Sequence, residues 1–533
     1  MTESLSFKQA LSVLSKSSPY SVATERSQSI STGLDGVKKY LYVETDIEKD
    51  FEKELSSLSV GQRKIIFLCG SSGDGKSEIL TKYSQKFKSR ANFHLDATHS
   101  FSPQDTAIQT LDKLFDTFSD NNHPLVVGIN VGMLGNYAVE GENECVANSI
   151  QAFLNNKSTH EEHVFLDFEQ YPKFKLEVAG HTSEFAKSLL QRITATDDNI
   201  IRQFFDKEIE SDSCDKRLCA NYELLSIDAV QDVVIDLLFK ARLMKDQFLT
   251  ARALLDFIYH LLTAPKYLFD NLFIPDENEL AAKVAEFDPA NIRSKLTDDF
   301  VLSHSLRLPD ESLNEYKKAL RTLNITITTA THASSYLRLF YVLRKHEFSN
   351  NYHQNFNAVF KESLIETYSS VWHLHQGFDN STEQKHALRT FYKDVVVTAI
   401  HKYNNRNAVG FHKGDFFISK HNEYYLASSL EIKANMNDIK FDVEKTVAHF
   451  NAYLKIGTET VSLQINSNLL SLMLRIVEGY RPNKHDKSTV VLLDEVVEKI
   501  AELANASDTL YIIKDKNRFN ITNVDDEFEV SGI

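Results

Sequence analysis

Four cysteines in 533 residues are too few for a disulfide framework and indicate a reducing compartment. The chain has only 17 glycines and 9 prolines, so no flexible or proline-rich linker is evident. No apolar run approaches the length of a membrane-spanning helix, and the first residues lack the basic and apolar segments of a secretory signal. We therefore expect a cytoplasmic protein without a membrane segment.

Basic residues are outnumbered by acidic ones, and the formal net charge is −15. This balance argues against strong electrostatic binding of nucleic acid by the chain as a whole. It is compatible with a local basic groove that binds nucleic acid. The apolar and charged fractions, 42% and 25%, are those of an ordinary globular protein. A chain of this length is expected to form three or four domains.

One segment, residues 70–77, fits the pattern G-x-x-x-x-G-K-[ST] without a mismatch. Five apolar residues precede it, at positions 65–69, as is typical of a buried parallel strand. Apolar residues at helical spacing follow it, namely Ile79, Leu80, Tyr83 and Phe87. A phosphate-binding loop requires this strand–loop–helix context. The sequence therefore predicts such a loop, and the alternative is a glycine-rich turn that binds nothing.

The predicted loop implies ATP and Mg²⁺ as ligands. Its glycines allow the backbone to curl so that successive N–H groups face phosphate oxygens, and the next helix adds its positive N-terminal end. Lys76 is expected to reach the β- and γ-phosphates, and Ser77 to hold Mg²⁺. The residues predicted to bind the nucleotide are Gly70, Ser71, Ser72, Gly73, Asp74, Gly75, Lys76, Ser77 and Glu78.

Two acidic residues at the ends of predicted strands are candidates for the Mg²⁺ site. Asp96 ends a short strand, and it either orders Mg²⁺ with its waters or caps the next element. Ala97 follows, where a glutamate that polarises the attacking water is usual, and this weakens the first interpretation. Asp167, at the end of a later strand, is the second candidate.

A polar residue, Asn130, ends the apolar run 125–129. Polar groups at the carboxyl ends of parallel strands lie in the nucleotide crevice. Asn130 is therefore a candidate to position the attacking water or to contact the γ-phosphate, and with Lys76 and Asp96 it completes the predicted catalytic set. The alternative is an asparagine that satisfies backbone groups of its own loop.

Strands alternate with helices in the first part of the chain, and a long helical series follows. We expect an α/β protein with a P-loop NTPase core of AAA+/STAND-like type, a large helical region and a C-terminal α+β module. The predicted segments are a helical lead-in (1–60), the ATPase core (61–180), a helical lid or middle region (181–405) and an interaction module (406–533). Within the module we expect strands at 416–419, 424–428, 441–443 and 461–465, among others.

Further side chains have two interpretations each. Tyr20 or Tyr42 either stacks on the nucleotide base or belongs to the core. Any of four arginines in the helical region is a candidate to meet the γ-phosphate or is solvated, namely Arg192, Arg202, Arg338 and Arg344.

A zinc site is a further candidate. Cys214 and Cys219 form a C-x₄-C pair that would combine with Cys145 and with His160 or His163. Paired C-x₂-C spacings are missing, so structural thiols are the alternative.

Several segments of the first half of the chain resemble one family. They are residues 18–20 with Glu25 and Arg26, residues 67–80, 96–103, 128–136 and 219–225. Together they resemble the DptF family, the F components of bacterial DNA phosphorothioation-dependent restriction systems. The resemblance implies an ATPase that acts with companion proteins against DNA lacking the phosphorothioate mark. On this resemblance, the chain contacts DNA either directly or through those partners. The sequence is also compatible with a homo-oligomer.

The chain contains no recognisable nuclease motif, so on this resemblance DNA cleavage belongs to a partner. The first hypothesis is an ATP-hydrolysing motor or switch in a restriction assembly. The alternative is a regulatory NTP-binding switch that hydrolyses little, which the missing glutamate after Asp96 favours. A small-molecule kinase is a third hypothesis, disfavoured by the long helical region and the C-terminal module.

Overall fold

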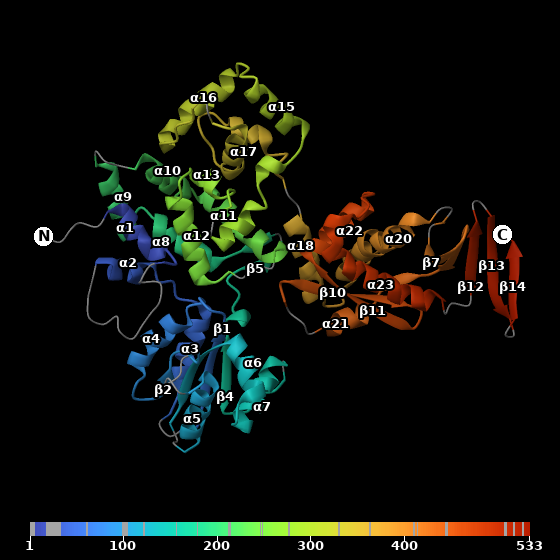
Figure 1. Cartoon of the computed structure of the whole chain (residues 1–533), viewed down its shortest axis with the longest axis horizontal. Coiled ribbons are helices and arrows are strands. Elements are labelled where there is room, and N and C mark those ends of the chain that lie inside the picture. Colours follow the sequence, from blue (N-terminus) through green and yellow to red (C-terminus); the bar gives the residue numbers. More distant parts are fainter. Residues whose placement is uncertain are drawn as a thin grey trace. The chain divides into compact units, whose positions relative to one another are not determined.

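Figure 1 shows the computed structural model, in which the described chain forms two compact units. The first unit comprises Met1–Phe174, Ser183–Arg242 and Gln247–Lys361, and the second comprises Lys175–Thr182, Leu243–Asp246 and Glu362–Ile533. The structure describes residues 6–17, 33–59, 62–98, 105–120, 123–155, 157–178, 180–211, 215–245, 247, 249–275, 278–328, 331–361, 364–408, 411–412, 414–442, 446–505, 509–514, 517–524 and 527–532.

A four-stranded parallel sheet organises the first part of the first unit. Its order is β2-β3-β1-β4, with β1 at Ile65–Gly70, β2 at Asn92–His94, β3 at Leu125–Asn130 and β4 at His163–Asp167. The central strand β1 pairs with β3 and β4 so that Ile65 faces both Leu125 and His163. The predicted parallel α/β sheet is therefore confirmed, with its strands where the apolar runs placed them.

Helices cover both faces of this sheet. Every residue of β1 is accordingly buried, and all of them are apolar or glycine. On one face Ile65, Phe67 and Cys69 pack with α5 (Ala107–Asp120), α6 (Val131–Glu140) and α7 (Glu144–Leu154). On the other face Ile66 and Leu68 pack with α3 (Asp46–Ser57) and α4 (Lys76–Lys86). Alternate side chains of one strand thus belong to two separate cores.

The rest of the first unit is helical. Its remaining α-helices are α1 (Phe7–Leu11), α2 (Gly33–Leu41), α8 (Glu184–Thr194), α9 (Ile200–Ile209), α10 (Lys216–Leu225), α11 (Asp228–Met244), α12 (Ala251–Thr263), α13 (Leu268–Asn271), α14 (Glu279–Ala285), α15 (Lys295–Ser305), α16 (Glu311–Leu320) and α17 (Ala333–Val342). The helical series that the sequence predicts after the alternating strands and helices is therefore present, for example in α8, α12 and α16.

The second unit contains antiparallel sheets. One has the order β14-β13-β12-β8-β7, a second β11-β10-β9, and β5 pairs with β6. The strands are β5 (Lys175–Glu177), β6 (Gly180–Thr182), β7 (Asp415–His421), β8 (Tyr424–Ser429), β9 (Ile432–Ala434), β10 (His449–Ile456), β11 (Glu459–Asn466), β12 (Thr509–Lys514), β13 (Asn517–Val524) and β14 (Glu527–Gly532). The α-helices are α18 (Leu364–Gln376), α19 (Thr382–Phe391), α20 (Thr398–Asn404), α21 (Met436–Phe441), α22 (Ser467–Val477) and α23 (Lys487–Asn505), and the π-helix Tyr392–Val397 joins α19 to α20.

One sequence prediction is contradicted by the structure in this unit, and one strand was missed. The strand predicted at 441–443 is wrong at Phe441, which ends α21, and Val443 lies outside the described residues. The Asn435 side chain accepts the backbone N–H groups of Asn437 and Asp438, which starts a helix there. The strand β10 was not predicted, although its alternate residues are buried.

Among the described residues, no helix combines the length and the apolar character needed to cross a membrane.

The buried His375 of α18 is expected to make the stability of the second unit depend on pH. Its ring is buried beside Phe450 and Tyr392, and burial lowers its pKa to about 4. An unfolded histidine has a pKa of about 6.5. Between these values the unfolded chain binds a proton that the folded chain does not, so acidification lowers the free energy of unfolding. The change is up to about 1.4 kcal/mol per pH unit.

We predict that His375→Gln flattens this dependence between pH 6.5 and pH 4. Denaturant unfolding at several pH values measures the slope. The exposed His386 provides the matched control, because His386→Gln should keep the slope of the unmodified chain. Equal slopes for His375→Gln and the unmodified chain would contradict the prediction.

Candidate functional site

The glycine-rich segment 70–77 joins the end of β1 to the start of α4. Gly73 and Gly75 have φ angles of +87° and +102°, which side-chain-bearing residues rarely adopt. Gly70 is needed for a different reason, because a Cβ atom there would lie 2.8 Å from the Phe168 ring. The glycines therefore allow both the curl of the loop and its close contact with the segment after β4.

The side chains of Lys76 and Asp74 form hydrogen bonds with the backbone of this loop. The Lys76 Nζ donates to the backbone oxygens of Gly70 and Ser71, both at 2.7 Å. One Asp74 oxygen accepts the Ser71 N–H at 2.7 Å, and the other pairs with Lys173 Nζ at 2.8 Å. The side chains of Asp74 and Lys173 are only 9% and 11% exposed. The ion pair thus connects the loop to the segment after β4 in a poorly hydrated position.

The carboxyl ends of the strands place the predicted polar residues beside the loop. Asn130 pairs with Gly70 across β3 and β1, and Asp167 pairs with Cys69 across β4 and β1. Asp96 follows β2 by two residues and accepts the Thr98 N–H and hydroxyl at 2.9 and 2.6 Å. The Asn130 side chain accepts the Met133 N–H at 2.7 Å and caps α6. Asp96 and Asn130 therefore make the local hydrogen bonds that the alternative interpretations predict. Both residues also line the cavity beside the loop.

A cavity of about 390 Å³ opens above the loop within the first unit. Residues 72–78 line it together with Asp96 and Asn130, whereas Gly70, Ser71 and Asp167 are not among its lining residues. Its remaining wall is largely apolar and includes Val13, Leu14, Leu41, Val43, Phe185, Leu189 and Leu255. The cavity thus has a polar floor and an apolar wall, which is the usual composition of a small-molecule site.

Two charged clusters border this cavity. Glu48 is fully buried, accepts the Tyr42 hydroxyl at 2.5 Å and pairs with Lys82 at 2.6 Å. Lys38 pairs with Glu78 at 2.9 Å. Tyr42 therefore lies at the cavity with its hydroxyl fixed, while the other predicted tyrosine, Tyr20, is outside the described residues.

Sequence reasoning missed two basic residues at this site. No local sequence pattern pointed to Lys173, because its partner Asp74 lies 99 positions away in the sequence. Arg252 lies in the first turn of α12, where its backbone N–H donates to the Gly73 oxygen at 3.2 Å, and it lines the cavity. Only its place near the start of a predicted helix could have suggested it.

The four predicted arginines make other contacts and are not among the residues that line the cavity. Arg192 donates to the Tyr40 oxygen, Arg202 pairs with Asp206, Arg338 pairs with Asp270 and Asp288, and Arg344 pairs with Asp236.

The Lys76 ammonium lies in a partly buried position between groups of both charges. Burial lowers the pKa of Lys76, the carboxylates of Asp74 and Asp96 oppose this shift, and Lys173 adds to it. An ammonium group that is held out of water beside another ammonium is stabilised by negative charge. The first turn of α4 adds the positive end of its helix dipole.

Comparisons of the chain with known protein families, with characterised proteins and with solved structures found no significant match. Parts of the segments that carry the DptF resemblance, residues 18–20, 25–26 and 99–103, also lie outside the described residues. The functional interpretation therefore depends on the geometry of the cavity and its loop.

We predict that the ion pair between Asp74 and Lys173 stabilises the first unit only as a pair. Lys173→Met leaves a buried carboxylate without its counter-ion and should cost about 3–5 kcal/mol of unfolding free energy. Adding Asp74→Asn should restore part of this loss, because the unpaired charge is removed. Denaturant unfolding of the two single variants and the double variant measures the coupling.

The exposed pair Glu315–Lys318 provides the control, and Lys318→Met should change stability by less than about 1 kcal/mol. A double variant whose loss equals the sum of the single losses would contradict the coupling.

Proposed function

We propose that this chain binds ATP with Mg²⁺ at residues 70–78 and hydrolyses it as part of a DNA restriction assembly. The observation that carries the proposal is the curled glycine-rich loop at the carboxyl end of a central parallel strand, with Lys76 at its turn and a cavity above it. Such an arrangement is the phosphate site of P-loop NTPases, and the AAA+/STAND-like type is the proposed class.

The cavity fits a nucleotide in size and in character. Its volume of about 390 Å³ lies in the range of small-molecule sites. The backbone N–H groups of the loop and the Lys76 ammonium would hold the phosphates, and Arg252 would add a second basic side chain in the same cavity. The apolar wall with Leu41, Tyr42 and Val43 would receive the base.

Ser77 and Asp96 are the proposed Mg²⁺ side of the site. Ser77 is the second residue of α4, and Asp96 lines the same cavity, which favours it over Asp167. Bound Mg²⁺ would supply charge neutralisation at the phosphates. The chain itself would contribute positioning and fixed positive charge through Lys76, Arg252 and the loop N–H groups.

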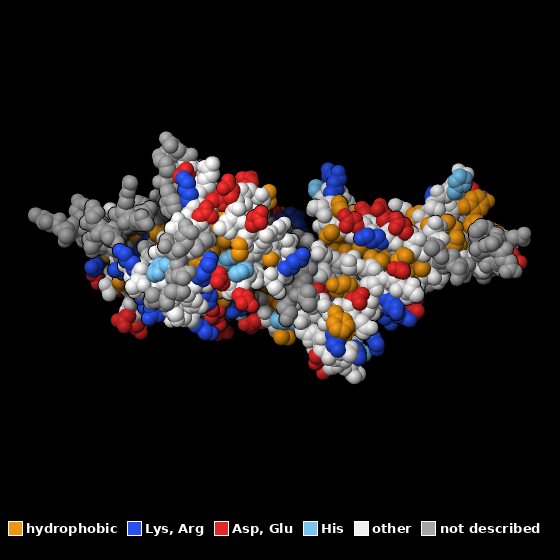
Figure 2. Space-filling model, turned by 90° about the horizontal axis from the view of Figure 1, so that it is seen from below, with side chains coloured by type: hydrophobic (Ala, Val, Ile, Leu, Met, Phe, Trp, Pro, Cys, Tyr) orange, Lys and Arg blue, Asp and Glu red, His pale blue; other side chains and the backbone are white. Residues whose placement is uncertain are grey.

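The restriction role rests on the resemblance to DptF, and the charge distribution favours partners as the route to DNA. The net charge of −15 opposes a general affinity for DNA. Acidic and basic side chains are interspersed over each unit on the face that Figure 2 shows. Companion proteins of the assembly would therefore carry the principal DNA contacts.

A second candidate function is an ATP-dependent assembly switch with little hydrolysis. Ala97, which is fully buried, occupies the position after Asp96 where a water-polarising glutamate is expected. Among the described residues that line the cavity, Glu48 and Glu78 are already paired with Lys82 and Lys38. These contacts leave no unpaired glutamate for the task in the described part of the wall.

We predict that Lys76→Ala lowers ATP turnover by about 100-fold or more, the usual cost of removing one electrostatic stabiliser. It should also abolish restriction in cells that carry the complete system. Phosphate release by the purified chain measures turnover, and circular dichroism checks the fold.

The matched control is Lys86→Ala, because Lys86 lies on the same helix and is 60% exposed. Measuring turnover with DNA and partner proteins separates the two candidate functions, since strong stimulation favours the ATPase. Undiminished turnover and restriction in Lys76→Ala would overturn the energy-coupling proposal.

We predict that Asp96→Asn weakens the Mg²⁺ dependence of ATP binding, whereas Asp167→Asn leaves it largely unchanged. The reason is that Asp96 lines the cavity and Asp167 does not. Titration of ATP into each variant at several Mg²⁺ concentrations measures the effect. The reverse ranking would assign the metal side to Asp167.

A further inference from the structure

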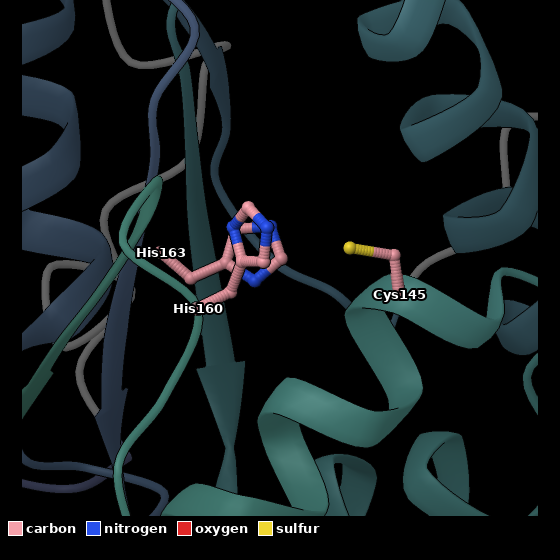
Figure 3. A group of neighbouring side chains, drawn as sticks. All are labelled: Cys145, His160 and His163. Atoms are coloured by element: carbon pink, nitrogen blue, oxygen red, sulfur yellow. The ribbon is translucent and has the colours of Figure 1, made fainter.

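Away from the proposed nucleotide site, the structure brings one cysteine and two histidines together. Cys145 is the second residue of α7, and His163 is the first residue of β4 with His160 shortly before it. Figure 3 shows their side chains gathered in one place, with the Cys145 sulfur directed at the two rings. One ligand atom from each residue lies within 4.8 Å of the other two.

The local backbone holds these residues in place. The His163 N–H donates to the His160 oxygen at 2.9 Å and closes a turn between them. The His160 N–H donates at 3.2 Å to the Ser149 hydroxyl, and Ser149 lies one helical turn after Cys145 on α7. The helix that carries the cysteine therefore also anchors the first histidine.

An independent observation indicates a missing ligand. His163 is 6% exposed, and its Nδ1 is buried without a hydrogen-bond partner in the described part of the chain. Buried polar atoms are nearly always paired, so an unpaired nitrogen on a ring that lies beside a thiol and a second imidazole needs an explanation. A metal ion would satisfy it.

We propose that Cys145, His160 and His163 bind a zinc ion. A thiolate with two imidazoles suits zinc, and three protein ligands leave a fourth position for water or another donor. Ligand atoms on one tetrahedral zinc are roughly 3.5 Å apart, given Zn–N and Zn–S bonds of about 2.0 and 2.3 Å. Cys145 and His160 are exposed and can close the remaining gap by small side-chain rotations. On binding, the Cys145 thiol releases its proton to solvent.

The proposed ion would have a structural role distinct from nucleotide binding. His163 pairs with Ile65 at the amino ends of β4 and β1, whereas the glycine-rich loop follows the carboxyl end of β1. The metal would tie the first turn of α7 to the start of β4 across the connection between them. It would therefore stabilise the first unit without contacting the phosphate site.

This ligand set keeps Cys145 and both candidate histidines of the sequence prediction but not its C-x₄-C pair. Cys219 is buried in α10 and does not belong to the group, and Cys214 lies outside the described residues. The spacing C-x₁₄-H-x₂-H, rather than the C-x₄-C pair, is the relevant pattern.

Cobalt titration of the full-length chain tests the proposal. After dialysis against EDTA, one equivalent of Co²⁺ should produce a thiolate-to-cobalt charge-transfer band with visible d–d bands, and Zn²⁺ should displace it. Cys145→Ser should lose the charge-transfer band, and His160→Gln should weaken cobalt binding by at least about 10-fold. Zinc should raise the melting temperature of the unmodified chain but not that of Cys145→Ser.

Cys214→Ser and His421→Gln serve as controls and should keep the full cobalt spectrum. Because Cys145 and His160 are exposed, their metal-free variants should melt close to the metal-free parent, which shows that they fold. A spectrum without the thiolate band, its persistence in Cys145→Ser, or its loss in Cys214→Ser would overturn the proposed ligand set.

Discussion

The candidate site depends on the contacts that the Asp74 carboxylate makes. It accepts the Ser71 N–H within the loop and pairs with Lys173, which follows the last strand of the sheet. Gly70 lets the Phe168 ring approach where any side chain would clash. The floor of the cavity is therefore fixed jointly by the loop and by residues about a hundred positions later. These contacts hold the loop in place without a ligand, which would lower the ordering cost of binding one.

Local charge matters more than net charge at this cavity. The chain carries −15 overall, yet three basic residues, Lys38, Lys76 and Arg252, line the cavity. Helix dipoles and oriented N–H groups add positive potential at the same place. On the proposed function, an acidic protein would offer an anion site here, because the local potential in a partly buried cavity depends on the nearest groups.

The two edges of the parallel sheet have different chemistry. The glycine-rich loop, Asn130 and Asp96 lie at or just after the carboxyl ends of its strands and contribute to the lining of the cavity. The amino edge carries the thiol and imidazoles of the proposed zinc site at the start of β4. Since β4 is paired with β1 along its whole length, a metal at one edge would support the strand that borders the loop at the other.

The sequence by itself determined the strand–loop–helix motif, the apolar strands and the positions of Lys76, Asp96 and Asn130 at their ends. These features are local, because glycine conformation, apolar runs and helical spacing act over a few residues. Tertiary structure alone decided the ion pair of Asp74 with Lys173, the place of Arg252 and the meeting of Cys145 with His160 and His163. Each of these joins residues from separate elements, and no local pattern records which elements pack together. The same reason explains why four plausible arginines proved to have other partners, while the one that lines the cavity went unnoticed.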